Sequence, residues 1–160
     1  MIQRIQSLFL LIAAALAVTV NFINVGTITL GDEIYYQFNS FTLDQVWEGT
    51  SQAVMHTTYI AVLWFVSAIL SLVTIFLYKN RQTQIRLNGI NMLVMLAALV
   101  VMLYIYPNLV FEKADWFENG MMVNFNYWTL LSLIPAVSLF FANRAIKKDE
   151  KRVRAADRLR

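Results

Sequence analysis

The sequence predicts an all-α membrane protein: a bundle of four transmembrane helices with a small extracytoplasmic β-hairpin or sheet cap and a basic cytoplasmic C-terminal helix. Three observations lead to this fold class. Four long apolar stretches carry no charged residue, and basic residues gather on alternate sides of them. The segments on the opposite side contain β-rich, aromatic runs around turn residues. Basic residues that alternate in this way follow the positive-inside rule, which indicates both class and topology.

The composition is that of a chain surrounded by lipid. Of the 160 residues 59% are hydrophobic, and the mean hydropathy is +0.56, whereas a soluble domain has about 45–50% apolar residues. The net charge of +3 hides a division, because 12 basic and 3 acidic residues lie on the expected inside while Lys113 alone accompanies seven acids outside. This division predicts anionic lipids of the cytoplasmic leaflet as partners and argues against nucleic acid. The absence of Cys excludes disulfides and thiolate metal sites.

The uncharged cores are 18, 20, 17 and 17 residues long, and run over 5–22, 59–78, 90–106 and 127–143. At about 1.5 Å per residue, such lengths suit helices that cross a hydrocarbon layer of roughly 30 Å. With interfacial turns added, the expected spans are 5–25, 55–78, 88–106 and 124–143, within a single domain of residues 1–160. The outer loops are then 26–54 and 107–123, and the cytoplasmic tail is 144–160.

We expect the first span to be a retained anchor, because its apolar core is longer than the roughly 7–15 residues of a secretory signal. Small and amide side chains recur along it in one stripe suited to helix packing, formed by Ala13, Ala17, Asn21 and Asn24.

The outer loops hold turn signals between β-rich runs. Residues 27–30 and 34–38 flank Gly31-Asp32, which predicts a hairpin, and Asn119-Gly120 before residues 121–125 predicts a second turn. Strands from the two loops are expected to pair into a small sheet over the helix ends. Residues 42–55 are expected to form a short helix, because Asp44 and Glu48 lie at helical spacing.

The two ends of the chain resemble those of a known family. The start Met1-Ile2-Gln3-Arg4-Ile5-Gln6 and the end, with Lys148-Asp149-Glu150-Lys151, Val153-Arg154 and Ala156-Asp157-Arg158-Leu159-Arg160, look like those of a bacterial family of four-span integral membrane proteins classed as a domain of unknown function. The resemblance covers the whole chain. It implies a fold and a membrane location, and it implies no activity.

None of the four uncharged cores contains Asp, Glu, Lys, Arg or His, although transporters and channels usually keep an ionisable residue at membrane depth. Ser67, Ser71 and Thr74 share one face of the second span, where packing is favoured over a solute path. His56, the only histidine, lacks the partners of a zinc site or a catalytic base. No catalytic or cofactor motif is present, so the sequence predicts neither an enzyme, a metal site nor a cofactor.

The tail is the strongest feature after topology, and it is expected to continue the fourth span as a helix. Its candidate docking residues are the basic side chains Arg144, Lys147, Lys148, Lys151, Arg152, Arg154 and Arg158. They suit anionic lipid. Because a lipid anchor alone does not require Asp149, Glu150 and Asp157, a protein partner stays open as the alternative.

These observations favour a non-enzymatic protein of the bacterial inner (cytoplasmic) membrane, multi-pass with both termini cytoplasmic. Its expected role is that of a scaffold or interaction subunit, with a protein partner bound through the outer cap or the basic tail. The alternative is a carrier or binding protein for a lipid or small hydrophobic solute. A sealed small-residue interface would favour the first, and an open tunnel lined by Asn21, Asn24 and Ser71 the second.

Overall fold

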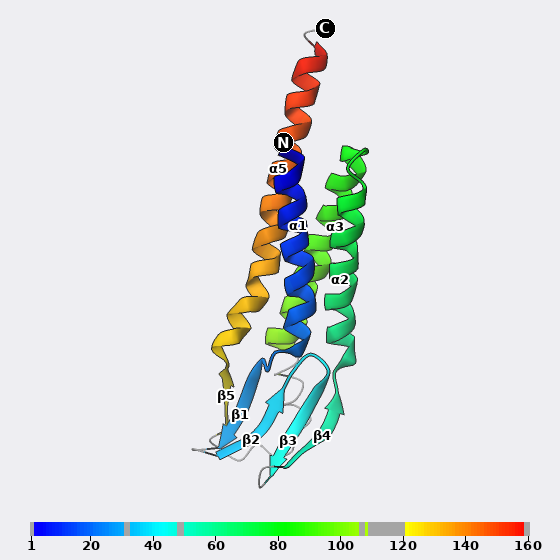
Figure 1. The fold of residues 1–160 in the computed structure, drawn as a ribbon. Coiled ribbons are helices and arrows are strands. Elements are labelled where there is room, and N and C mark those ends of the chain that lie inside the picture. The colour runs from blue at the N-terminus through cyan, green and yellow to red at the C-terminus, as the bar shows by residue number, and fades with distance from the viewer. Residues whose placement is uncertain (1, 31–32, 48–49, 106–107, 109–120, 159–160) are drawn as a thin grey trace.

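The computed structural model describes residues 2–30, 33–47, 50–105, 108 and 121–158. The helices run side by side and a sheet lies at one end of them, which we call the sheet end (Figure 1). The first helix begins and the last helix finishes at the other end, the terminal end, where the last helix projects past its neighbours. The molecule therefore has an elongated helical part and a smaller β part.

The helical part contains α1 (Ile2–Thr19) with a 3₁₀ turn η1 (Val20–Phe22), α2 (Thr58–Phe76), α3 (Arg81–Val100) with a π-helical end η2 (Val101–Ile105), and a 3₁₀ segment η3 (Tyr127–Ser132) leading into α5 (Leu133–Arg158). Four helical stretches are long and apolar enough to cross a membrane: Ile5–Phe22, Thr58–Phe76, Arg81–Ile105 and Tyr127–Ala155. The number and order of the four predicted long apolar helices are confirmed. α5 continues without a break to Arg158.

Five antiparallel strands form the sheet, in the order β4-β3-β2-β1-β5. They are β1 (Gly26–Leu30), β2 (Glu33–Phe38), β3 (Thr42–Trp47), β4 (Thr50–His56) and β5 (Met121–Phe125). The hairpin predicted across residues 31–32 is confirmed by the pairing of β1 with β2. The turn expected at Asn119-Gly120 lies outside the described residues. The strand after it, β5, pairs with β1, so the two loops share one sheet as expected.

The short helix expected over residues 42–55 is wrong, since these residues form β3 and most of β4. Two acids at helical spacing are a weak signal. The segment is rich in β-branched residues, among them Thr42, Val46, Thr50 and Val54, which pack well on a pleated surface. Pairing of β3 with β2 also satisfies backbone groups along that edge of β2, which a helix over residues 42–55 would leave unpaired.

A few residues that were expected to belong to the spans instead belong to strands of the sheet. β4 ends at His56 and β5 at Phe125, so α2 begins at Thr58 and η3 at Tyr127 rather than at residues 55 and 124. At the terminal end the difference is in the opposite direction, because α3 begins at Arg81, seven residues before the expected start at 88. Its N-cap is Asn80, whose side chain accepts a hydrogen bond from the Thr83 N–H at 3.2 Å.

One hydrophobic core runs from the bundle into the sheet. Alanines at the helix contacts, together with Trp64, continue into Ile28, Tyr36 and Phe38 of the strands. Gly26 makes this junction possible, because a Cβ there would lie 2.7 Å from the Phe38 ring and 2.8 Å from the Asn124 carbonyl oxygen. The sheet is therefore packed on the helix ends by its own side chains.

Candidate functional site

Polar side chains are buried between α2 and α3 in a row that we call the polar seam. They are 0–4% exposed and comprise Ser67, Ser71, Thr74, Gln84, Asn88 and Asn91. The three residues that the sequence proposed for helix packing, Ser67, Ser71 and Thr74, all lie in this interface. No charged residue belongs to the seam.

Asn91 is the centre of the seam. Its Oδ1 accepts a hydrogen bond from the Ser67 hydroxyl at 2.7 Å, and its Nδ2 donates to the Ser71 Oγ at 2.8 Å. The Ser71 hydroxyl donates in turn to the Ser67 carbonyl at 2.9 Å. Each of these polar groups thus finds its partner inside the protein, which is the arrangement that a non-aqueous surrounding requires.

Amides extend this bonding toward the terminal end. The Gln84 Nε2 donates to the Thr74 carbonyl at 3.0 Å, which joins α3 to the last turns of α2. The Asn88 Nδ2 donates to the Leu139 carbonyl at 3.1 Å, and the Gln6 Nε2 donates to the Ala145 carbonyl at 3.2 Å. Because the acceptors Leu139 and Ala145 belong to α5, these amides tie α3 and α1 to the last helix.

Gln6, Gln84, Asn88 and Asn91 were not identified as packing residues from the sequence. A signal was present on α3. Gln84, Asn88, Asn91, Met95 and Ala98 recur at alternating intervals of four and three residues, which places them on one helix face. The expected span began at residue 88 and cut this pattern.

Three of the four residues proposed for the packing stripe on α1 are buried in the structure. Ala13, Ala17 and Asn21 are fully buried, and the Asn21 Nδ2 donates to the Ala17 carbonyl at 3.2 Å. Asn24 does not extend the stripe, because the helical turns end at Phe22. Its Oδ1 instead accepts a hydrogen bond from the Gly26 N–H at 3.1 Å, an Asx turn that starts β1.

The proposed docking residues of the tail gather on one side of α5. Six side chains, all from α5, line a hollow of about 500 Å³, namely Phe140, Asn143, Arg144, Lys147, Lys148 and Lys151. Four of the six are cationic and no acid lines the hollow, so an isolated anion would be attracted there. Phe140 is half exposed toward the sheet end, and we call the whole surface the basic face.

The acids of the tail have partners within the chain. The Asp149 carboxylate lies 3.0 Å from the Arg81 guanidinium, which also donates to the Asp149 carbonyl at 3.2 Å. Glu150 pairs with Arg154 at 2.8 Å, one helical turn away. Asp149 thus holds α5 against α3, and Glu150 forms an ion pair with Arg154. Because neither partner lines the hollow, these two acids do not neutralise the cations of the basic face.

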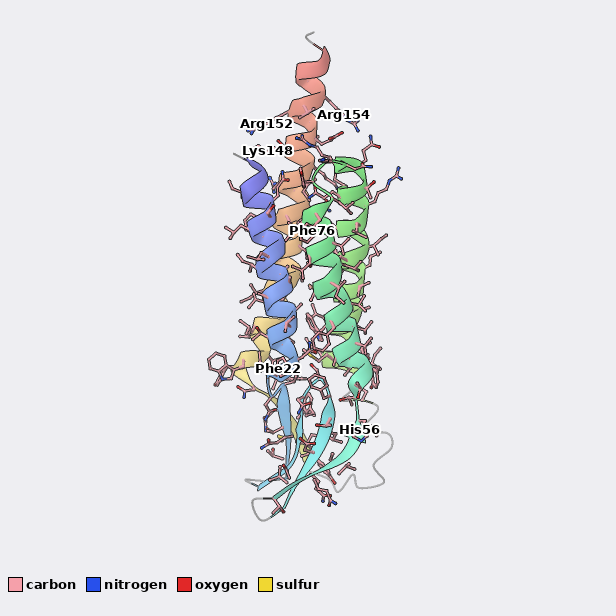
Figure 2. The ribbon with its side chains drawn as sticks, turned by 45° about the vertical axis from the view of Figure 1, so that its right-hand side comes forward. Phe22, His56, Phe76, Lys148, Arg152 and Arg154 are labelled. Atoms are coloured by element: carbon pink, nitrogen blue, oxygen red, sulfur yellow. The ribbon has the colours of Figure 1, made fainter. Side chains whose placement is uncertain are left out.

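The remaining docking candidates lie farther along α5. Figure 2 shows Lys148, Arg152 and Arg154 around the part of α5 that reaches the terminal end and continues beyond it. Arg152 and Arg154 do not line the hollow of the basic face. Arg158 is the last residue of α5. The structure therefore divides the seven candidates into a compact group of four and a projecting remainder.

A second hollow, which we call the junction hollow, lies where the helices meet the sheet. It has a volume of about 290 Å³ and is lined by Asn21, Phe22, Asn24, Gln37, Phe38, Asn39, Phe41 and Asp44. It contains two of the three residues whose joint presence in a tunnel would favour a carrier. The third, Ser71, lies in the polar seam and does not line this hollow.

His56 lies at the end of β4, exposed, close to where α2 begins (Figure 2). Within the described part of the chain, no three His, Asp or Glu side chains lie together in a group that could hold a metal ion.

Fold and site together define a class: a bundle of four apolar helices whose interior carries neutral polar side chains, joined to a five-stranded antiparallel sheet. The chain belongs to the family described as domain of unknown function DUF4293, which matches residues 2–159. No curated protein shows significant similarity to it.

Proposed function

We propose that this chain is a non-enzymatic, four-span protein of the bacterial inner membrane, with both termini cytoplasmic, that acts as a scaffold or interaction subunit. The observation that carries the proposal is the sealed helix interface. In the polar seam the Ser67 and Ser71 hydroxyls and the Asn91 amide bond to one another, with Asn91 bonded on both sides. Such an interface holds helices in a fixed arrangement and offers no path to a solute.

The distribution of apolar residues supports the membrane placement. On α2 the outward side chains Val62, Ile69 and Phe76 are 52%, 58% and 78% exposed, while Ser67 and Ser71 on the inner face are fully buried. Large exposed apolar surfaces are unfavourable in water by about 25 cal/mol per Å². An apolar outside with a polar seam inside is favourable only where lipid surrounds the helices.

The charge pattern supports the orientation. Arg81 and Arg86 of α3 and the basic side chains of α5 lie toward the terminal end. Asp44 lies in the sheet. Positive charge on the cytoplasmic side is the rule for short segments next to membrane helices.

Anionic lipid is the partner that suits the basic face. The acids of the tail were the reason to consider a protein partner there. Two of them, Asp149 and Glu150, form ion pairs within the chain, with Arg81 and Arg154. Four cations beside the apolar Phe140 match a phosphate headgroup next to acyl chains. Each basic residue near such a surface contributes about 1 kcal/mol.

A protein partner is better placed at the sheet. β4 is a terminal strand of the described sheet, and all of its residues except Met55 are exposed. Edge strands present a row of backbone donors and acceptors that can pair with a strand from another chain. The scaffold role therefore assigns lipid to the terminal end and protein to the sheet end.

Topology is the first test. Reporter fusions after Gln84 and Arg160 should report the cytoplasm, and fusions after Asn39 and Asn119 the far side. One reversed signal would refute the four-span arrangement.

Cross-linking tests the scaffold role. A photoreactive residue at Gln52 on the β4 edge should give a discrete protein adduct in cells, and one at Gln82, exposed at the terminal end, should not. Transport is the opposing outcome. Proteoliposomes that contain the protein should be no leakier to protons or small ions than empty ones, and a saturable flux abolished by Asn21→Ala would favour a carrier.

A further inference from the structure

The junction hollow combines an unpartnered amide oxygen and a carboxylate with an aromatic wall. Its lining residues come from η1, from the residue before the turn into β1, from the end of β2 and the turn after it, and from β3. Figure 2 shows Phe22 at this junction, between the end of α1 and the strands. All of the lining residues belong to the described part of the chain.

Asn21 supplies a buried acceptor. Its side chain is fully buried, and its Nδ2 donates to the Ala17 carbonyl at 3.2 Å. This bond fixes the amide orientation, because the reverse orientation would place two oxygens against each other. The Asn21 Oδ1 then has no hydrogen-bond partner within the described residues. A buried acceptor without a donor is costly, and it favours a ligand that brings an N–H or O–H group.

Asp44 is the charged residue among the described residues that line the hollow. It lies on β3 opposite Gln37 of β2. Its carboxylate forms no ion pair with any other described residue. The hollow is therefore negative, and it repels phosphate and carboxylate ligands while it attracts a cation.

The other amides that line the hollow shape it. Asn39 Oδ1 accepts hydrogen bonds from the Phe41 N–H at 2.8 Å and the Thr42 N–H at 2.9 Å. Asn24 bonds to the Gly26 N–H and, at 3.4 Å, to the Gln37 Oε1. These bonds hold the turns on either side of the hollow. The acceptors left for a ligand are the Asn21 Oδ1 and the Asp44 carboxylate.

Aromatic rings and size decide what kind of cation fits. Phe22, Phe38 and Phe41 line the hollow, and the Phe22 and Phe41 ring centroids are 6.0 Å apart. Aromatic faces attract ammonium groups and also cover attached carbon atoms. The volume of about 290 Å³ far exceeds the roughly 10–15 Å³ that one water molecule needs. A bare metal ion would leave most of it empty, so the size of the hollow favours an organic cation.

We propose that the junction hollow is a binding site for a primary ammonium group. Three N–H donors of such a group can serve the Asn21 Oδ1 and the Asp44 carboxylate together, whereas a quaternary ammonium has no donor for either. The source is an aminophospholipid headgroup or a free amine. The lipid source rests on the proposed function, because only a chain placed in the membrane as described brings the hollow to the level of the outer headgroups.

The test uses the full chain, purified in maltoside detergent. Four probes are compared by equilibrium binding: phosphatidylethanolamine and phosphatidylcholine in mixed micelles, and free ethanolamine and choline. The ethanolamine form should bind at least about ten-fold more tightly than the choline form in each pair that binds. Asp44→Asn, which keeps the shape and removes the charge, and Asn21→Ala should each weaken binding about ten-fold. Asn124→Ala, which removes an exposed amide elsewhere on the sheet, is the matched control and should bind as the wild type does.

Each outcome decides a point. Binding of free ethanolamine identifies the ammonium alone as the ligand, and binding of phosphatidylethanolamine only identifies the lipid. Equal affinity for the ethanolamine and choline forms, or no binding of either, overturns the proposal, and so does unchanged affinity in a folded Asp44→Asn protein. If Asp44→Asn does not fold, the proposal is tested by two other measurements: the preference of the wild type for ethanolamine over choline, and the affinity of the Asn21→Ala variant. Reversed reporter fusions with intact ammonium binding would refute the membrane orientation and leave the site standing.

Discussion

The hydrogen bond between Ser67 and Asn91 offers a direct measure of how strongly the polar seam holds α2 to α3. We would replace Ser67 by Ala, Asn91 by Ala, and both together. Ser67→Ala removes one side-chain bond, the one of 2.7 Å to Asn91. Asn91→Ala removes that bond and the one of 2.8 Å to Ser71. The bond from Ser71 to the Ser67 carbonyl survives both changes, because its acceptor belongs to the backbone.

The expected magnitude follows from the number of bonds. Hydrogen bonds between membrane helices contribute about 0.6 kcal/mol on average and up to roughly 1.7 kcal/mol. Ser67→Ala should therefore cost about 0.6 kcal/mol, and Asn91→Ala about 1.2 kcal/mol plus the cost of the space it leaves. Adding the two single effects counts the shared bond twice. The loss of stability in the double variant should therefore be about 0.6 kcal/mol smaller than the sum of the losses in the two single variants.

Unfolding in mixed micelles of maltoside and dodecyl sulfate, followed by tryptophan fluorescence, measures these differences. Trp64 is fully buried and lies one helical turn from Ser67, so it reports separation of α2 from its neighbours. The control cycle combines Ser67→Ala with Asn124→Ala of β5, for which the effects should add. A Ser67–Asn91 coupling that cannot be distinguished from zero, or that equals the coupling of the control pair, would show that the seam does not hold the helices.

Three further predictions concern packing, pH and lipid. Ser71→Leu should destabilise the bundle by about 1–3 kcal/mol, because the larger side chain separates closely packed helices. Ser71→Ala should reduce the stability less in the same unfolding assay. A Ser71→Leu protein as stable as the wild type would contradict close packing at this position. Burial raises the pKa of the Tyr36 hydroxyl above its ordinary value of 10.0, so its contribution to stability is complete below pH ~10 and is lost as the pH rises from there through the folded-state pKa. Tyr36→Phe should reduce this alkaline loss in thermal unfolding measured against pH, and an identical pH profile would refute the assignment. Replacing Lys147, Lys148 and Lys151 by Gln should leave the fold intact and weaken retention of phosphatidylglycerol by up to about 100-fold, at about 1 kcal/mol per residue. Native mass spectrometry checks this, with phosphatidylcholine as the control lipid, and unchanged retention would exclude the basic face as a lipid site.

Local patterns were enough to predict the helices and the first hairpin. An uncharged apolar run needs no distant partner to be recognised, and Gly31-Asp32 between β-rich runs is a signal within a few residues. β3 and β4 were missed because their strand character depends on an edge that β2 provides. Asp44 and Glu48 gave a helical spacing that no apolar face supported.

The polar seam could be predicted only on its α2 side. Ser67, Ser71 and Thr74 share a face within one apolar run, so their spacing is visible in sequence. Gln84, which bonds to the Thr74 carbonyl, precedes the expected third span, and Asn88 is the first residue of that span, where polar residues are unremarkable. The acceptors of Gln6 and Asn88 are backbone carbonyls of α5, at Ala145 and Leu139. A carbonyl carries no sequence signal, so these bonds require the folded structure.

The junction hollow and the basic face place opposite chemistry at opposite ends of the bundle. Asp44 and the Asn21 Oδ1 suit an ammonium group at the sheet end, whereas Lys147 and its neighbours suit a phosphate near the terminal end. The seam between them contains neutral amides and hydroxyls bonded to one another or to backbone carbonyls, and in the proposed function it fixes the spacing of the two ends. If both sites bind lipid headgroups, the chain is held at a set depth and in one orientation. A protein held in this way can present the β4 edge to a partner at a constant height above the membrane, which is the property that a scaffold needs.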